Sequence, residues 1–224
     1  MTIEIAKYLD STLLRADATA GEVIKLCQDA KNLGVAAVCI NPWRLDLARE
    51  RLVGSEVALC TVIGFPLGAC DVERKLDEID WAMDRGATEI DMVMNIGAFK
   101  DQEYITVAEE IRLAARRVQE RGGLLKVIVE TALLNPEELR RACIVVRDGG
   151  ADYIKTSTGF STRGVSLDDI HIIRKSVGDA LKIKASGGVK THDFALKLIK
   201  AGADRLGTSS AREVMKEFED NEEA

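Results

Sequence analysis

The sequence is poor in the residues that build metal centres and disulfide frameworks. It has two histidines and five cysteines among 224 residues, and no pair of cysteines follows the C-x-x-C spacing of zinc sites. An odd number of cysteines without such spacing favours reduced thiols that serve mainly as packing residues, as in cytoplasmic proteins. We therefore expect neither a structural metal nor a disulfide scaffold from Cys27, Cys39, Cys60, Cys70 and Cys143.

A strong excess of positive charge and a long apolar run are also missing. The chain carries 31 basic and 37 acidic side chains, a formal net charge of −6, with both signs interspersed. Nucleic acids and anionic membranes bind clustered Lys and Arg, so neither is an expected partner. The first ten residues show no signal-peptide pattern and no segment resembles a membrane span, so we expect a cytoplasmic protein. A single phosphate is compatible with this charge, because backbone N–H groups can bind it.

A glycine-led junction recurs along the chain. Hydrophobic residues make up 46% and charged residues 30%, which is ordinary for a globular domain with a large core. In four places an amphipathic charged segment is followed by glycine and then by apolar residues, at Gly34, Gly86, Gly150 and Gly202. Glycine fits the left-handed position that ends a helix, so each junction predicts a helix followed by a strand. Helix starts are indicated by a capping box at Thr19 and Glu22 and by Asn135-Pro136.

Eight short apolar runs alternate with these helical segments. The predicted strands are Ala6–Asp10, Ala36–Ile40, Ala58–Gly64, Glu89–Asn95, Leu124–Glu130, Tyr153–Ser157, Leu181–Ala185 and Asp204–Gly207. Eight strand–helix units in a chain of this length predict one (β/α)8 TIM barrel over residues 1–224, with a short acidic tail at 217–224. An open doubly wound sheet is the alternative, but the G-x-G-x-x-G turn common in such folds is missing.

Several predicted strands end in polar or charged groups, and TIM barrels carry their functional groups at the carboxyl ends of the strands. The residues there are Asp10, Asn41, Gly64, Asp91, Glu130, Lys155, Lys184 and Gly207. Charged groups in otherwise apolar strands are unexpected in a packed core and expected in a functional site.

Lys155 and Lys184 lie in neighbouring predicted strands, the sixth and the seventh. If both point inward, two ammonium groups share a poorly solvated space, which favours a neutral and therefore nucleophilic amine on one of them. A neutral lysine attacks aldehydes and ketones to give an iminium, which acts as an electron sink for carbon–carbon cleavage. Surface positions or structural ion pairs are the alternative for both lysines.

Asp91 lies between Ile90 and Met92, where a carboxylate needs a cationic or hydrogen-bonding partner. Lys184 could supply it, and a carboxylate–lysine pair can transfer protons; a purely structural salt bridge is the alternative. Lys126 and Glu130 share a side-chain parity and are expected to form a supporting charge network. Lys182 is expected to be solvated or ion-paired, and His171 and His192 to have surface or helix-terminal roles.

Three late stretches rich in glycine and hydroxyl groups, at 158–159, 186–190 and 207–210, each follow a predicted strand. Loops after the last strands of a TIM barrel, together with a helix N-terminus, recurrently bind phosphate, although ordinary turns also use Gly and Ser. The predicted substrate- and phosphate-binding residues are Asp10, Thr156, Thr158, Gly159, Gly187, Gly188, Gly207, Ser209 and Ser210.

Motifs in order over residues 5–215 resemble the deoxyribose-phosphate aldolase family. They are Leu9-Asp10-Ser11-Thr12-Leu13-Leu14, Cys39-Ile40-Asn41-Pro42, Gly64-Phe65-Pro66-Leu67-Gly68, Glu89-Ile90-Asp91-Met92-Val93, Lys126-Val127-Ile128-Val129-Glu130, Ile154-Lys155-Thr156-Ser157-Thr158-Gly159-Phe160 and Lys184-Ala185-Ser186-Gly187-Gly188-Val189. The resemblance implies a class I aldolase without metal or cofactor. Such an enzyme reversibly cleaves 2-deoxy-D-ribose 5-phosphate to D-glyceraldehyde 3-phosphate and acetaldehyde in deoxyribonucleoside catabolism, and is a homodimer or homotetramer.

The resemblance also implies residue roles. Lys155 matches the Schiff-base lysine, Lys184 the lysine that activates it and joins in proton transfer, and Asp91 the acid/base partner. The chain departs from the family pattern at Ser11, where histidine is common, and at Arg15, where lysine is common. Its tail, residues 217–224, has no tyrosine such as assists proton transfer in some members.

Three other functions share part of this pattern. A transaldolase-like or other sugar-phosphate aldolase would use the same Schiff-base lysine and phosphate site with a different donor substrate. A phosphate-binding isomerase of similar fold would need no covalent lysine. A sugar-phosphate sensor is disfavoured, because two inward lysines are a costly way to build a simple binding pocket.

Overall fold

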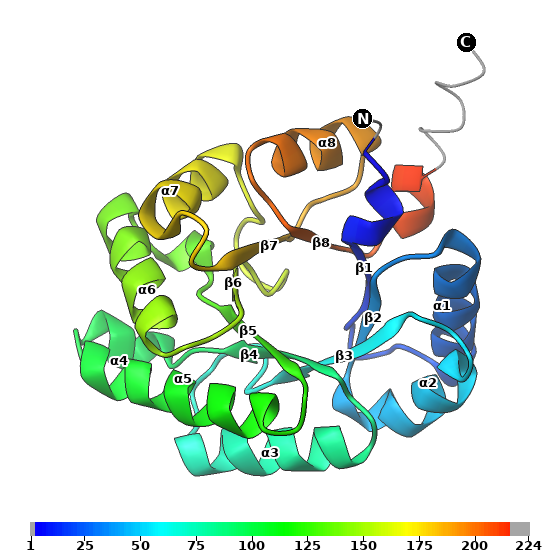
Figure 1. The fold of residues 1–224 in the computed structure, drawn as a ribbon, viewed down its shortest axis with the longest axis horizontal. Helices are drawn as coiled ribbons and strands as arrows, with labels where there is room; N and C mark the ends of the chain where they lie inside the picture. Colours follow the sequence, from blue (N-terminus) through cyan, green and yellow to red (C-terminus); the bar gives the residue numbers. More distant parts are fainter. Residues whose placement is uncertain (1–2, 216–224) are drawn as a thin grey trace.

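The computed structural model describes residues 3–215, and these form a closed barrel of eight parallel strands. Each strand pairs with its sequence neighbours, and β1 pairs with β8 to close the ring (Figure 1). The strands are β1 Leu9–Leu13, β2 Ala37–Ile40, β3 Ala58–Ile63, β4 Glu89–Val93, β5 Leu124–Ile128, β6 Tyr153–Lys155, β7 Lys182–Ser186 and β8 Arg205–Thr208. The predicted TIM barrel is therefore confirmed, and the open doubly wound sheet is excluded.

Helices surround the ring of strands on its outer side (Figure 1). They are α1 Ala20–Leu33, α2 Leu45–Leu52, α3 Val72–Asp84, α4 Ile96–Lys100, α5 Tyr104–Gln119, α6 Pro136–Asp148, α7 Leu167–Val177 and α8 His192–Lys200. Residues 211–215 are also helical. In the described part of the chain, no helix is both long and apolar enough to cross a membrane. The predicted acidic tail at 217–224 lies outside the described residues.

The helix ends follow the local sequence signals. All four junction glycines have positive φ, from 64° at Gly34 to 113° at Gly202, as a left-handed helix end requires. The side chain of Thr19 accepts a hydrogen bond from the backbone N–H of Glu22, whose carboxylate bonds back to the Thr19 N–H. Asn135 and Glu138 form the same reciprocal cap at the start of α6. Local capping thus marks where α1 and α6 begin before any tertiary packing is considered.

The predicted strand bounds were wrong in one important place. Residues Ile5–Tyr8 form a short 3-10 helix, and β1 begins only at Leu9. The apolar residues Ile5 and Ala6, which suggested a strand, are instead buried as part of this turn. Asp10 is consequently the second residue of β1 and lies opposite Gly207 of β8, not at the carboxyl end of its strand.

Other strands end earlier than predicted because the following residues have turn or cap roles. Asn95 caps α4 by accepting a hydrogen bond from the Ala98 N–H, so β4 stops at Val93. Glu130 has a φ of 54°, which is incompatible with a strand, so β5 stops at Ile128.

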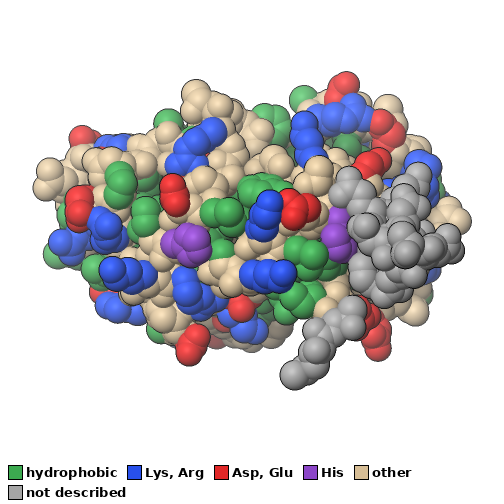
Figure 2. Space-filling model, turned by 90° about the horizontal axis from the view of Figure 1, so that it is seen from above, with side chains coloured by type: hydrophobic (Ala, Val, Ile, Leu, Met, Phe, Trp, Pro, Cys, Tyr) green, Lys and Arg blue, Asp and Glu red, His purple; other side chains and the backbone are tan. Residues whose placement is uncertain are grey.

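The main core lies between the strands and the helices, while the barrel interior holds charged groups beside a small second apolar cluster from β2 and β3. In β4, Ile90 and Met92 belong to the apolar cluster shared with the helices. Asp91 alternates with them and faces the interior, where it binds lysines from three other strands. The outer surface carries both signs of charge interspersed over the face seen in Figure 2, as the sequence predicts.

Candidate active site

Lys155 and Lys184 are direct neighbours across the β6–β7 pair. Because paired residues in parallel strands point to the same face, both side chains enter the barrel. Their Nζ atoms lie 2.7 Å and 2.6 Å from the same oxygen, Oδ2 of Asp91. The structure therefore brings together the three residues that the sequence singled out as the reacting group.

The other Asp91 oxygen, Oδ1, is also fully engaged. Lys126 Nζ donates to it from 2.9 Å, and the Cys60 thiol donates from 3.2 Å. Burial alone would raise the pKa of Asp91, but Lys126, Lys155 and Lys184 together outweigh burial and hold that pKa well below its ordinary value. Asp91 is thus a carboxylate clamped between two lysines on one side and a lysine with a thiol on the other.

Asp10 forms a second carboxylate centre next to the first. Lys184 Nζ lies 2.5 Å from Asp10 Oδ2, and Arg205 Nε lies 2.7 Å from Asp10 Oδ1. Burial would raise the pKa of Asp10, but Lys184, Arg205 and Lys126 lower it to about 2. Burial likewise would lower the pKa of Lys184, whereas Asp10 and Asp91 raise it above its ordinary value. Lys184 is therefore held as an ammonium.

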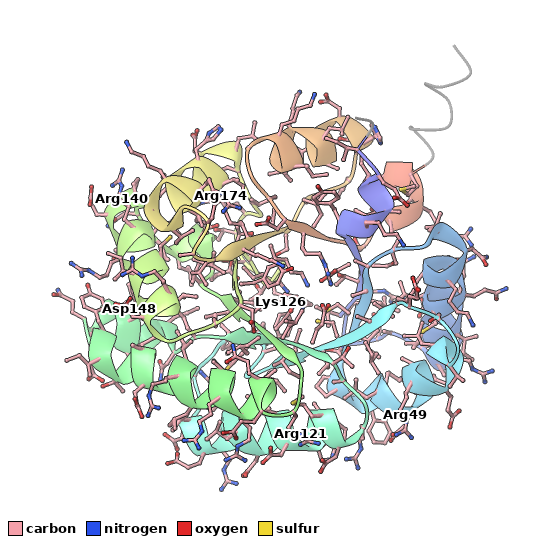
Figure 3. The ribbon with its side chains drawn as sticks, in the orientation of Figure 1. Arg49, Arg121, Lys126, Arg140, Asp148 and Arg174 are labelled. Carbon is pink, nitrogen blue, oxygen red and sulfur yellow. The ribbon has the colours of Figure 1, made fainter. Side chains whose placement is uncertain are left out.

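Glu89 completes this buried cluster at the start of β4. It accepts from Lys126 Nζ at 2.6 Å, and Arg205 Nη2 donates to both of its carboxylate oxygens, at 2.7 and 2.8 Å. Figure 3 shows Lys126 inside the ring of strands, in contrast to Arg49 and Arg140 on the outer helices α2 and α6. If all groups are ionised, the four cations Lys126, Lys155, Lys184 and Arg205 exceed the three carboxylates Asp10, Glu89 and Asp91 by one charge. A neutral amine on one lysine removes this costly excess.

A cavity of about 750 Å³ opens above this cluster. Of the three lysines in this cluster, Lys155 alone lines the cavity; Lys126 and Lys184 are buried outside its wall. The predicted site residues in the wall are Lys155, Thr158, Gly159, Gly187, Gly188, Gly207 and Ser209. One amine thus faces the space where a substrate would bind, and the remaining charges support it from behind.

Four other predicted residues lie outside the cavity wall in addition to Lys184. Asp10 and Asp91 are fully buried in the charge cluster described above. The hydroxyl of Thr156 links β6 to β7 by donating to the Ser186 carbonyl and accepting from the Ser186 N–H. Ser210 donates its N–H to the Thr208 hydroxyl. Direct substrate contact by Asp10, Thr156 or Ser210 stays a prediction.

The loop after β7 exposes its backbone to the cavity. Gly187 and Gly188 have φ angles of 84° and 80°, a region that residues with a Cβ rarely adopt. The backbone of Gly164 approaches Gly187 so closely that a Cβ on Gly164 would lie 2.0 Å from the Gly187 carbonyl oxygen. Two consecutive glycines in this conformation form a concave backbone surface of the kind that binds anions.

Basic side chains surround the same cavity. Arg15, Lys25, Arg163 and Lys190 all line it. Arg15 is paired with Asp17 and Glu22, and Arg163 with Asp169. Glu22 and Asp29 also line the cavity, but the basic side chains outnumber them, and an excess of positive charge in a cleft favours an anionic substrate.

Some expectations about supporting residues were wrong. Lys126 does belong to a charge network, but Glu130 does not share it. Glu130 instead accepts hydrogen bonds from the backbone and the hydroxyl of Thr158 and so fixes the loop after β6. The parity argument failed because Glu130 lies in a left-handed turn after the strand.

Lys182 is exposed and lies 5.6 Å from the centroid of the Tyr153 ring, in agreement with its predicted solvation. His171 is exposed, and His192 begins α8, although it is buried with Nδ1 3.1 Å from the Val214 carbonyl.

Glu89, Arg205 and Cys60 were missed by sequence reasoning. All three lie inside the barrel and contact Asp10, Asp91 or Lys126. A signal did exist: Glu89 stands two residues before Asp91, so it shares the inward face of β4. Arg205 and Cys60 occur near the starts of their strands, where a charged or thiol side chain has many structural roles.

Comparisons with known proteins agree with this geometry. The family model described as DeoC/LacD family aldolase matches residues 5–217. The deoxyribose-phosphate aldolase of Thermococcus kodakarensis is 45% identical over 214 residues, which cover 95% of this chain and 96% of that protein.

Two solved structures show the same likeness. The aldolase QR15 superposes with a TM-score of 0.94 at 39% identity, covering 99% of this chain and 98% of its own. The deoxyribose phosphate aldolase of Aeropyrum pernix, described as having a unique tetrameric structure, gives a TM-score of 0.87 at 33% identity, covering 96% and 91%. Together with the lysines and the carboxylate gathered beneath the cavity, these matches establish that the chain belongs to the DeoC/LacD family of aldolases.

Proposed function

We propose that this protein is a deoxyribose-phosphate aldolase, which reversibly cleaves 2-deoxy-D-ribose 5-phosphate to D-glyceraldehyde 3-phosphate and acetaldehyde through a Schiff base on Lys155. The observation that carries the proposal is the position of Lys155. Its side chain lines the cavity, and its Nζ lies 2.7 Å from Asp91 Oδ2, the oxygen that Lys184 Nζ contacts at 2.6 Å. The names of the relatives supply the substrate, and the basic rim of the cavity suits its phosphate.

The chemistry begins with the neutral Lys155 amine attacking the C1 aldehyde of the open-chain sugar. Loss of water from the adduct gives an iminium, and the Asp91–Lys184 pair is placed to exchange the protons of this step. The iminium then accepts the electron pair of the C2–C3 bond as the C3 hydroxyl loses its proton. D-Glyceraldehyde 3-phosphate leaves, and the enamine that remains is protonated and hydrolysed to acetaldehyde and free Lys155.

The phosphate is proposed to bind at the far end of the cavity from Lys155. The left-handed backbone at Gly187 and Gly188 offers N–H donors, and Ser209 adds a hydroxyl. Lys25 and Lys190 supply charge without any ion pair among the described residues that would compete with the phosphate. Binding energy from the phosphate holds the aldehyde against Lys155, which converts a slow bimolecular attack into a positioned one.

We also propose that the protein acts in the cytoplasm and forms a homodimer or homotetramer. The tetrameric structure described for the Aeropyrum pernix relative supports an assembly of identical chains. Reduced cysteines support the location, since all five are free thiols in the structure. Light scattering after gel filtration measures the assembly directly.

The decisive experiment is reductive trapping. The protein is incubated with 2-deoxyribose 5-phosphate and sodium borohydride, digested and mapped by mass spectrometry. We expect a stable adduct on the peptide that contains Lys155 and none in the Lys155→Met variant. Lys182→Met serves as a matched control, because it removes an exposed lysine from the adjacent strand and should trap as well as the parent protein.

The outcomes separate the competing functions. An adduct on Lys155 with a ketone donor but none with acetaldehyde would indicate a transaldolase-like enzyme. Turnover of a sugar phosphate without any adduct would indicate an isomerase. Binding without turnover or adduct, in protein shown to be folded by circular dichroism, would indicate a sensor.

A further inference from the structure

Two thiols lie directly behind Asp91, and the proposed mechanism uses neither. Cys39 of β2 and Cys60 of β3 are paired in register and are both fully buried. Their sulfur atoms and a carboxylate oxygen of Asp91 all lie within 4.8 Å of one another. Both side chains therefore project into the barrel and meet at the catalytic carboxylate.

The backbone places these thiols where a disulfide can form. Neighbouring strands lie about 4.7–4.9 Å apart, within the range of about 4.4–6.8 Å that disulfide-bonded Cα atoms span. The two residues are exact register partners on the concave side of a closed barrel, so their Cβ atoms converge further. The other cysteines lack such a partner: Cys27 and Cys143 lie in the outer helices α1 and α6, and Cys70 lies in a loop.

The surroundings divide the two thiols into different roles. A hydrogen bond from Cys60 lowers the pKa of Cys39, whereas burial raises the pKa of Cys60 well above its ordinary value. Lys126 Nζ also lies 3.5 Å from the Cys60 sulfur. Cys39 is therefore the more readily ionised thiol of the two, which assigns it the nucleophilic role and Cys60 the resolving role.

A small oxidant in the cavity is close to this pair. Lys155 lines the cavity and contacts Asp91 Oδ2, and the Cys39 sulfur lies 3.8 Å from the same oxygen. The side chains of Lys155 and Asp91 therefore stand between the cavity and Cys39. Hydrogen peroxide, which is little larger than water, can pass them through side-chain motion, whereas a bulky alkylating reagent is held back.

We propose that Cys39 and Cys60 form a peroxide-sensitive dithiol whose oxidation to a disulfide inactivates the enzyme. In the first step the Cys39 thiolate attacks hydrogen peroxide, the O–O bond breaks, and the second oxygen leaves as water after taking a proton. In the second step the Cys60 sulfur displaces the hydroxyl of the Cys39 sulfenic acid as water, with its own proton, and the S–S bond forms. Sulfur loses two electrons and peroxide gains them. The loss of activity, though not the modification itself, rests on the proposed function.

Oxidation alters the site because both thiols serve Asp91. Cys60 donates to Oδ1 from 3.2 Å and Cys39 contacts Oδ2 from 3.8 Å. A disulfide removes both S–H groups and draws the sulfurs together, so Asp91 loses two of the contacts that hold it between Lys155 and Lys184. A displacement of about 1 Å in a reacting group lowers rate by about 100-fold.

The test treats the full-length protein with hydrogen peroxide and follows two readouts in parallel. Non-reducing peptide mapping identifies disulfides, and the aldolase assay gives the ratio of oxidised to reduced activity. We expect a linked pair of peptides containing Cys39 and Cys60, a large loss of activity, and recovery of both with dithiothreitol. Cys60→Ala should keep its activity ratio near one, while Cys70→Ser and Cys27→Ala should lose activity as the parent does.

Two results would overturn the proposal. One is a mapped digest in which Cys39 and Cys60 stay unlinked after the parent has been inactivated. The other is inactivation of Cys60→Ala to the same extent and with the same reversibility as the parent. Cys39→Ala, judged folded by circular dichroism, repeats the test from the other sulfur. Because the linkage is read by mass, it can be present even if the parent proves to lack aldolase activity, which would overturn the proposed function alone.

Discussion

The barrel interior and the loops at its carboxyl end manage charge in different ways. Inside, Asp10, Glu89 and Asp91 are matched by lysine and arginine side chains at 2.5–2.9 Å, away from solvent. In the loops, Gly187 and Gly188 offer backbone N–H groups, and the cations of the rim are exposed. Buried charges must be compensated by fixed partners, whereas the exposed charges of the rim are solvated by water until an anion binds.

This difference assigns different tasks to the two regions. The interior holds reacting groups in one geometry and sets their protonation, so its residues should act mainly on kcat. The rim contributes binding energy that is modest for each group, so its residues should act mainly on KM. Substitutions in the two regions can therefore test this division of tasks.

The largest effect is expected from Lys155→Met. Removing the nucleophile closes the covalent route, so kcat should fall on the order of 10⁴-fold or more. Because the Lys155 amine is neutral in the proposed mechanism, its replacement leaves the buried charges balanced, and the fold should stay intact. Steady-state cleavage assays and thermal unfolding measure the two effects, and a variant that retains substantial turnover would remove Lys155 from the proposed role.

Asp91→Asn should follow, with kcat lower by about 10²–10⁴-fold. The substitution also leaves three lysine side chains without their shared carboxylate, so unfolding should require about 3–5 kcal/mol less. Glu110→Gln is the matched control, because it breaks the buried pair of Glu110 with Lys75 outside the barrel. It should destabilise the protein while kcat changes far less; an equal fall in kcat would show that stability alone explains Asp91→Asn.

The pH dependence of stability should report the interior directly. The folded-state pKa of Asp10 is about 2, below its ordinary 3.8, so its ionised form stabilises the fold above pH 3.8. This stabilisation, about 2 kcal/mol, is lost as pH falls through the window from about 4 to about 2. Urea unfolding across this window should show a shallower fall in Asp10→Asn than in the parent.

Asp148→Asn, which removes an exposed carboxylate on α6, should leave the parent's acid profile unchanged. If the free energy of unfolding of Asp10→Asn falls with pH as steeply as that of the parent, the interior carboxylates do not control acid stability.

The smallest effect is expected at the rim from Lys190→Ala. The KM for 2-deoxyribose 5-phosphate should rise about twofold to fivefold at low salt, since an exposed charge contributes little. The difference should shrink as salt is added, and kcat should stay the same. Lys200→Ala, at the end of α8 and away from the cavity, is the control. A fall in kcat without a change in KM would place Lys190 in the chemistry and not in phosphate binding.

The barrel could be predicted because its signals are local. Helix caps, junction glycines and apolar runs each depend on a few consecutive residues. The eightfold repetition of the apolar runs left little choice of architecture. The first strand failed because Ile5 and Ala6 are buried in a short 3-10 turn, and four residues show no usable periodicity. That error of three residues also misplaced Asp10 at the top of its strand.

The candidate site was predictable where a residue type was out of place for its strand. Lys155, Lys184 and Asp91 stand among apolar neighbours, so their presence demanded partners. Glu89, Cys60 and Arg205 were missed, because nothing local says which strand start faces which partner across the barrel. Cys60 and Asp91 are 31 residues apart, and Arg205 and Asp10 are 195 apart.

The sequence by itself determined the eight strand–helix units, the lysines in neighbouring strands and the glycine loops, since each depends on neighbouring residues. Only the tertiary structure decided that Asp91 joins three lysines, that Lys155 alone of these reaches the cavity, and that Cys39 and Cys60 meet behind it. The physical reason is closure of the barrel. Strand register and the inward side-chain period fix distances between residues far apart in the chain, and those distances set charge, protonation and access.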